Sequence, residues 1–331
     1  MDPNRIVDMA SAFYESCVLF AASDLGIFGK LAELGEADLE TVIAACGLDR
    51  RGGRILLDAC VALELLEKKA GHYRNSPEAA LFLVPGSPAD LSGAIRYNRD
   101  VYGAWGRLKE MAVTGKPVER PETHLGEDEE RTRTFVLAMH GRALGIGRAV
   151  VPLLDLAGRR KVLDVGGGPG TYSVLIAQAH PDVECTVIDL PNVVRTGALL
   201  IAQAGMSGRV MTLAGDYHSV PFPGGNDVVL FFGMLHQERE EAIRDLLRRA
   251  HQALAPGGTI YVLDMMTDSS RARPKFSALF SVNMALTTDD GWVFSDEDLE
   301  SWLVEAGFRE HSSRPLPPPM PHRLASARRP G

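Results

Sequence analysis

The stretch KVLDVGGGPGTY, Lys161–Tyr172, decides the fold, because it joins a short apolar run to a glycine-rich turn and the start of a helix. Its first five residues are mostly valine and leucine, as in a strand buried on both faces of a parallel sheet. Gly166, Gly168 and Gly170 follow with GxGxG spacing, and glycine lets a backbone approach a bound ligand closely. The stretch therefore predicts the first strand and ligand-binding turn of a doubly wound α/β sheet.

After Arg160, short apolar runs alternate with helical segments. The later runs, ECTVIDL, RVMTLAGD, DVVLFFGML and TIYVLDMM, predict four more strands. Such alternation is typical of a Rossmann-like domain, which we place at 156–331, with ligands at the carboxyl ends of the strands. The Pro-rich, basic tail RPLPPPMPHRLASARRPG is expected to lose order towards its end.

The residues before this domain are expected to be mainly helical. The segment DMASAFYESCVLFAASDLGIFGKLAEL is apolar at helical spacing, and two short helices follow it. The next segment, KKAGHYRNS, predicts a hairpin. Helix, turn, helix and hairpin make a winged-helix module over 1–90, which we expect to serve dimerisation or to act as a lid over the substrate. Residues 91–155 would form a helical connector that contributes to the pocket.

A winged helix also raises the hypothesis of a DNA-binding regulator. Residues 1–90 hold eight Lys or Arg against fourteen Asp or Glu, and the whole chain has a net charge of −8. A DNA-reading module should show a basic face, so we expect no nucleic-acid partner.

Other features favour a cytoplasmic protein that does not bind a membrane. We expect no apolar run of the roughly 20 residues that a membrane span needs, and MDPNRIVDMA does not resemble a secretory signal. The four cysteines show no metal-ligand spacing, so we expect reduced thiols and no metal site.

The glycine spacing bears on the cofactor. Dinucleotide sites prefer GxGxxG, but Thr171 stands where the third glycine would be. Asp164 precedes the turn, and Asp189 closes the second strand, where an acid can accept hydrogen bonds from ribose hydroxyls. A nicotinamide enzyme stays open as an alternative, and Thr171 counts against it.

The combination of DVGGGPG, VIDLPNVV and AGDYHSVP resembles the S-adenosylmethionine-dependent small-molecule O-methyltransferases of the plant-phenol and bacterial natural-product type. LFAASDLGIFGKLAE is similar to the dimerisation helix of that family, FVLAMHGRA to a helix over its pocket, LAPGGTIYVLD to its fifth strand and VEAGF to its last helix. The resemblance covers about residues 10–315. It implies S-adenosylmethionine as cofactor, a small-molecule acceptor and a homodimer.

The resemblance also implies roles for the cofactor residues. The three glycines of the turn would surround the methionine end of the cofactor, and Asp164 before them would also belong to the cofactor site. Asp189 would bind the ribose and Leu190 would pack on the adenine. Asp216 would bind the adenine amino group, with Tyr217 alongside.

His236, in the sequence LHQE, stands where the resembled family has its general base in LHDW. A histidine suits that role near neutral pH. Gln237 and Glu238 replace the Asp and Trp of that motif, and Val293 stands where the family has an acid that orients the histidine. Without such an acid the imidazole is less fixed. Glu238 and two further acids, Asp289 and Asp290, are the candidates to replace it.

The acceptor pocket is expected between two helical segments. The resemblance places Phe135 and Met139 on one of them, and Phe276, Phe280, Asn283 and Met284 on the other. Trp105 is expected to pack within the helical domain. Arg142 could bind a carboxylate if it faced the pocket, but a surface or interdomain salt bridge is favoured.

Three chemistries stay open. O-methylation with His236 as base is favoured. C- or N-methylation of a small molecule would rely on positioning rather than on a strong base. A relative that binds the cofactor without transferring methyl is the third possibility.

Overall fold

The computed structural model describes residues 2–87, 89–119, 129–318 and 320–331. Two compact units divide the chain, Met1–Asp100 and Val101–Gly331, and the division falls inside helix α7 (Ser92–Trp105).

The first unit is helical with a small three-stranded sheet. Its remaining elements are α1 (Asn4–Ser11), α2 (Phe13–Asp24), α3 (Ile27–Leu34), β1 (Ala37–Asp38), α4 (Leu39–Cys46), α5 (Arg50–Ala62), β2 (Leu66–Lys69), β3 (His72–Asn75) and α6 (Pro77–Phe82). The predicted hairpin is β2–β3, and β1 pairs with β3 to complete the sheet. Asp38 and Asp49 accept backbone N–H bonds at the starts of α4 and α5. The winged-helix arrangement expected from the sequence is therefore present.

Helices α1 and α2 are joined, because Ala12 between them also has helical backbone angles. Among the described residues, the joined segment Asn4–Asp24 is the one that is long and apolar enough to cross a membrane by length and composition, with a mean hydropathy of 1.3. The expectation that no segment would reach this length was wrong. Its side chains are largely uncovered, including Ile6, Met9 and Tyr14, each more than half exposed.

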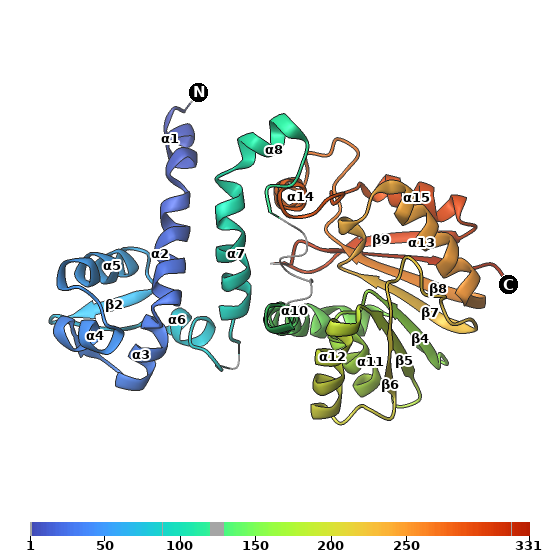
Figure 1. Cartoon of the computed structure of the whole chain (residues 1–331), viewed down its shortest axis with the longest axis horizontal. Helices are drawn as coiled ribbons and strands as arrows, with labels where there is room; N and C mark the ends of the chain where they lie inside the picture. The colour runs from blue at the N-terminus through green and yellow to red at the C-terminus, as the bar shows by residue number, and fades with distance from the viewer. Residues whose placement is uncertain (1, 88, 120–128, 319) are drawn as a thin grey trace. The chain divides into compact units, whose positions relative to one another are not determined.

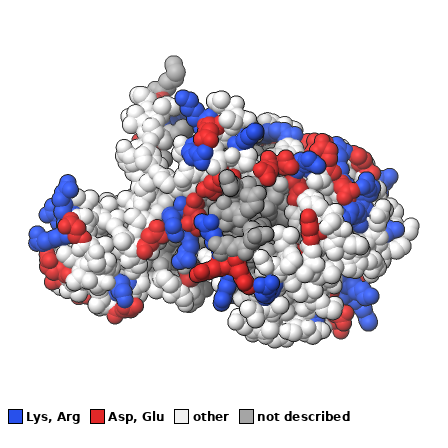
Figure 2. Space-filling model, in the orientation of Figure 1, with Lys and Arg blue, Asp and Glu red and all other residues white. Residues whose placement is uncertain are grey.

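Charged side chains of both signs are mixed on the molecular surface. Figure 2 shows Lys and Arg interspersed with Asp and Glu over the described residues of the face in view.

The second unit is a seven-stranded sheet with helices on both faces (Figure 1). The strands are β4 (Lys161–Val165), β5 (Glu184–Asp189), β6 (Val210–Ala214), β7 (Asn226–Phe232), β8 (Leu254–Asp264), β9 (Arg309–Pro315) and β10 (Arg323–Arg328). Their order is β6-β5-β4-β7-β8-β10-β9; β10 runs antiparallel to both β8 and β9, and the other neighbouring strands pair in parallel. This is the doubly wound sheet predicted from the sequence.

Two apolar cores cover the two faces of that sheet. The helices of this unit are α8 (Leu108–Thr114), α10 (Glu129–Val150), α11 (Thr171–Ala179), α12 (Pro191–Gln203), α13 (Glu240–Ala253), α14 (Lys275–Thr287) and α15 (Asp296–Glu305), with short turns η1 (Val151–Leu153) and η2 (Leu235–Gln237). Helices α10, α11 and α12 cover one face, and α13 and α15 cover the other (Figure 1). Ser295 and Asp298 form the predicted capping box of α15.

The chain's tail differs from the expectation. Instead of losing order, it supplies the end of β9 and all of β10, which extend the sheet beyond β8. Leu324, Ala325 and Ala327 are buried there, so apolar contact holds the strand in place. As a result, residues near 322 lie beside the carboxyl end of β8, since Arg323 pairs with Asp264.

Candidate active site

The glycine turn after β4 has the backbone that its sequence requires. Gly166, Gly168 and Gly170 have φ of 64°, 56° and 72°, in the left-handed region that favours glycine. Gly166 N–H also donates to the Ile188 carbonyl at 2.9 Å, which ties the turn to the end of β5. A Cβ at Gly168 would meet no atom within 4 Å, so open space lies beside this residue.

Two buried carboxylates flank the turn, and neither has a cationic partner among the residues that the structure describes. Asp189 accepts N–H bonds from Gly168 and Leu190, each at 2.7 Å, and each of its oxygens can accept another. Burial raises the pKa of Asp189 to about 6, although these two N–H groups oppose the shift. Burial likewise raises the pKa of Asp164 to about 6. Asp164 bonds to Ser173 through Oδ2, while its buried Oδ1 has no partner among the described residues.

The turn therefore suits a ligand rich in hydroxyl and ammonium donors. The ribose and methionine ends of S-adenosylmethionine need hydrogen-bond acceptors and room. Asp164 has an unsatisfied acceptor, Asp189 can accept further hydrogen bonds, and Gly168 has open space beside it. The residues present thus fit that cofactor.

His236 lies in η2, directly after β7, and is held by an acid at the end of the neighbouring strand. Its Nδ1 lies 2.7 Å from Oδ1 of Asp264, and its backbone N–H donates to Oδ2 at 3.3 Å. Asp264 is fully buried, which by itself would raise its pKa. The charge of His236 and its hydrogen bond, helped by the Met265 N–H, instead hold that pKa below its usual value. An ionised Asp264 can only accept, so Nδ1 carries a proton, and when the imidazole is neutral Nε2 keeps its lone pair.

The acid that orients His236 is therefore not one of the three candidates from the sequence. Glu238 is occupied by the Tyr217 hydroxyl at 2.6 Å and by His218 at 3.2 Å. Asp289 and Asp290 are exposed. Val293, at the position where the resembled family has its acid, is buried in an apolar cluster, and its side chain cannot hydrogen-bond to His236.

The loop that carries His236 packs against the glycine turn. A Cβ at Gly166 would lie 3.1 Å from Cγ of Met234, two residues before His236. The Trp292 N–H donates to the His236 carbonyl at 2.9 Å, and its indole donates to the Glu238 carbonyl. These contacts fix the loop from both sides.

The residues expected around adenine lie at the ends of β5 and β6. Gly215 N–H donates to the Asp189 carbonyl, which brings the exposed Asp216 next to the end of β5. Leu190 is partly buried at the start of α12. Tyr217 packs against the core.

An apolar wall stands beside His236. Met265, Phe280, Met284 and Val293 form a buried cluster, and the Phe280 ring lies edge-on to His236, with ring centres 5.1 Å apart. Phe276, 52% exposed, stacks on Phe280.

Asn283 is buried in α14, and its Oδ1 accepts from the indole of Trp105 at 2.9 Å. Trp105 was expected to pack within the helical domain, and its indole N–H, which needs a partner, finds one on α14. Phe135 and Met139 are partly buried on α10. In the same helix, His140 bonds to the Thr171 hydroxyl at 2.7 Å, at the start of α11.

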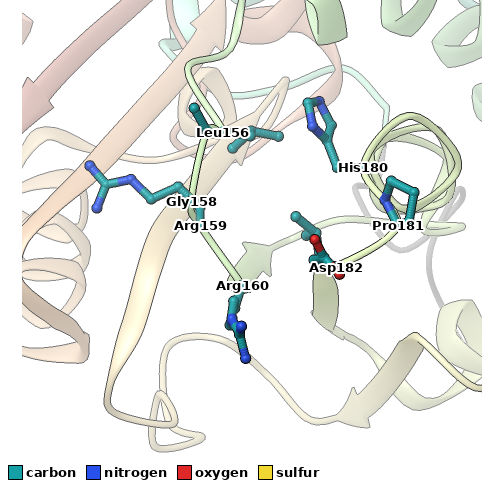
Figure 3. A pocket seen from close by; sticks show the side chains of 9 residues that line it. Leu156, Gly158, Arg159, Arg160, His180, Pro181 and Asp182 are labelled. Atoms are coloured by element: carbon teal, nitrogen blue, oxygen red, sulfur yellow. The ribbon is translucent and has the colours of Figure 1, made fainter.

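A hollow of about 300 Å³ lies at the opposite, amino-terminal edge of the sheet (Figure 3). Its lining includes Arg159, Arg160 and His180, which lie before β4 and β5. Ligands of doubly wound sheets bind at the carboxyl edge, so we assign the site to the edge that carries His236.

Comparison with known proteins agrees with this geometry. The family model for the O-methyltransferase domain matches residues 114–309, and that for the O-methyltransferase dimerisation domain matches residues 7–85. The 3-hydroxy-5-methyl-1-naphthoate 3-O-methyltransferase of Streptomyces sahachiroi is 35% identical over 93% of this chain and 90% of its own. The tetracenomycin polyketide synthesis 8-O-methyl transferase of Streptomyces glaucescens is 33% identical over 93% and 92%.

A solved structure is similar throughout. Human N-acetylserotonin methyltransferase in complex with SAM superposes with a TM-score of 0.89 at 28% identity, covering 100% of this chain and 99% of its own. The chain therefore belongs to the O-methyltransferase family, whose members are S-adenosylmethionine-dependent methyltransferases with an N-terminal dimerisation domain.

Proposed function

We propose that this protein methylates a hydroxyl group of an aromatic or polyketide-like small molecule, with His236 as the general base. The observation that carries the proposal is the 2.7 Å contact between His236 Nδ1 and the buried Asp264, at the sheet edge that also carries the glycine turn. Relatives named for a naphthoate and for tetracenomycin polyketide synthesis support this acceptor class.

The cofactor binds along the ends of β4, β5 and β6 in this proposal. Gly166, Gly168, Gly170 and Asp164 hold its methionine end, and Asp189 accepts hydrogen bonds from the ribose. Leu190, Asp216 and Tyr217 surround the adenine. S-adenosylmethionine supplies a methyl group activated by a positively charged sulfonium.

His236, in its neutral form, removes the acceptor's proton at Nε2, because its Nδ1 proton is directed to Asp264. The imidazolium formed is stabilised by the buried carboxylate, which is a stronger interaction inside the protein than in water. Because Asp264 and the Trp292 N–H fix the loop, the acceptor oxygen meets a base held in one orientation.

The acceptor packs against α10 and α14 in this proposal. Phe280 and Met284 supply an apolar wall beside His236, and Asn283 supplies an amide whose Oδ1 is held by Trp105. Phe135 and Met139 close the pocket from α10.

We also propose that two copies of the chain associate through their N-terminal helices. The match to the dimerisation domain and the uncovered apolar side chains of α1 support a homodimer.

The cofactor assignment is tested by thermal unfolding with S-adenosylhomocysteine and, separately, with NAD. A ligand that binds only the native state raises Tm, so S-adenosylhomocysteine should stabilise the protein and NAD should not. A shift with NAD alone would contradict the assignment.

The role of His236 is tested by His236→Ala. Loss of a general base should lower kcat by about 10²–10⁴ while S-adenosylhomocysteine binding stays intact. Near-full activity would instead favour a reaction that needs only positioning, such as N-methylation, since an N,N-dimethyltransferase of Streptomyces rimosus is also 31% identical to this chain.

A further inference from the structure

Arg142 lies on the same face of α10 as the residues assigned to the pocket. Phe135, Met139, Arg142 and Ile146 follow one another at intervals of three or four residues, which places them in one stripe along the helix. Ile146, at the end of the stripe, is buried in the core beneath the sheet. The stripe therefore faces the protein, and Arg142 is partly buried with it.

No hydrogen bond or ion pair joins Arg142 to any residue that the structure describes. The salt bridge expected for it is thus absent from the described part of the chain. A partly buried guanidinium has five N–H donors, and leaving them unpaired is costly. This arrangement is typical of a side chain kept for a ligand.

His322 lies on the same sheet edge. The next residue, Arg323, pairs with Asp264, the partner of His236, so His322 sits beside the catalytic pair. His322 is only 6% exposed, and its Nδ1 has no partner among the described residues. Burial, followed by the charge of Arg142, lowers the pKa of His322 to about 4, so its ring is neutral near pH 7.

Arg142 also acts on Tyr172, at the start of α11. Burial raises the pKa of Tyr172, and the charge of Arg142 opposes that rise. The Tyr172 ring contacts Phe232, the last residue of β7, with ring centres 5.1 Å apart. Arg142 therefore lies near groups at the carboxyl ends of both β7 and β8, where the acceptor is expected.

We propose that Arg142, with His322 beside it, binds a carboxylate of the acceptor, so that the preferred substrates are hydroxylated aromatic carboxylic acids. This inference rests on the proposed function and specifies its substrate class. A guanidinium matches a carboxylate through two parallel N–H···O bonds. The single positive charge of Arg142, with His322 neutral, matches the single negative charge of a carboxylate. A phosphate dianion would carry one more negative charge, and the nearby Asp264 would repel it.

The test compares a hydroxynaphthoate with the naphthol that lacks its carboxylate, using the full chain saturated with S-adenosylmethionine. Wild-type protein should have the lower KM for the hydroxynaphthoate. Arg142→Gln should raise that KM about 10- to 100-fold, the loss expected for a charged hydrogen-bonded pair, and leave the KM for the naphthol within about twofold. Arg142→Lys, which keeps the charge but not the paired donors, should lie between.

Arg148→Gln is the matched control, because Arg148 is an exposed arginine on the same helix. It should leave both KM values unchanged. The Kd of the hydroxynaphthoate for the S-adenosylhomocysteine complex gives a readout that needs no turnover, and Tm with S-adenosylhomocysteine shows that each variant is folded.

Two results would overturn the carboxylate assignment. One is a wild-type protein that binds the naphthol as tightly as the hydroxynaphthoate. The other is an Arg142→Gln variant that weakens S-adenosylhomocysteine binding but keeps the wild-type preference for the acid, which would assign Arg142 to the cofactor. Failure of the proposed function looks different: the hydroxynaphthoate would bind in an Arg142-dependent manner, yet no hydroxyl would be methylated.

Discussion

At the scale of single residues, the proposed role of His236 as a base depends on how its ring is oriented. Asp264 holds Nδ1 at 2.7 Å and also accepts the backbone N–H of the same residue, so one carboxylate fixes both the ring and the loop. The nearby Glu238 is instead committed to Tyr217 and His218. The two acids close to His236 therefore have separate tasks.

Asp264→Asn should lower kcat by about 10²–10⁴, because an amide can hold the imidazole in the wrong tautomer and does not stabilise the imidazolium. The measurement is steady-state methyl transfer over a range of pH, with Tm and S-adenosylhomocysteine affinity as checks on folding. Asp290→Asn, which changes an exposed acid near the site, is the control and should keep wild-type activity. Equal activity of the two variants would contradict the assigned role.

Cofactor affinity should depend on the ionisation of Asp189. Burial raises its pKa to about 6 in the free protein, whereas ribose hydroxyls that donate to it favour the carboxylate. Protons then compete with the ligand, so affinity is full well above pH 6 and declines as the pH falls through 6. At about pH 5 the Kd of S-adenosylhomocysteine should be roughly tenfold weaker than at about pH 7.5. Calorimetry measures this, and Asp189→Asn should bind weakly with a flatter pH profile.

The sequence located His236 but not its partner, for a physical reason. The hydrogen bond joins residues 28 positions apart, and it forms because β7 and β8 are parallel neighbours whose carboxyl ends meet. The register of these two strands, in which Phe232 pairs with Leu263, places Asp264 next to the loop that follows β7. The sequence alone does not give this register. An Asp at the end of the strand TIYVLD was the available signal. The resemblance directed attention to the region of Val293 instead.

At the scale of elements, the glycine turn combines two demands. Its left-handed backbone favours glycine on conformational grounds, and its ligand requires space. These demands can be separated, because Gly158 also has a positive φ, of 70°, and open space around it, but lies at the opposite edge of the sheet.

Gly168→Ala and Gly158→Ala should therefore lose similar stability, roughly 1–2 kcal/mol each, the cost of a left-handed residue with a Cβ. Only Gly168→Ala should lose affinity for S-adenosylhomocysteine, because its methyl group enters the space beside Asp189. Chemical denaturation and calorimetry measure the two effects. An equal loss of affinity in both variants would show that the turn acts through stability alone.

Elements with strong local signals were predicted well, and β10 was not. The apolar runs in β4, β5 and β7, rich in β-branched and aliphatic residues, indicated buried strands because both faces are covered. The strand RLASAR has two alanines and three polar residues, so its own sequence carries little β signal. Pairing with β8 and β9 and burial of Leu324 supply what the local sequence lacks.

At the scale of the whole molecule, the first unit presents apolar side chains that its own core does not cover. Ile6, Val7 and Met9 are each about 60% exposed on α1, which has no buried residue. An exposed apolar helix in a domain of the dimerisation type indicates contact with a second copy.

The full chain should therefore sediment as a dimer, and the double variant Ile6→Asp/Met9→Asp should shift it to monomer. Burying two carboxylates in an apolar interface costs more free energy than the apolar contact of this helix provides. The dimer Kd should therefore rise at least 100-fold. Leu199→Asp is the matched control, because Leu199 is 58% exposed on α12 in the other unit. Sedimentation velocity over a concentration series measures the shift, together with a Tm that depends on concentration only where a dimer forms. A wild-type chain that stays monomeric at micromolar concentration would contradict this prediction, and so would a double variant that remains dimeric.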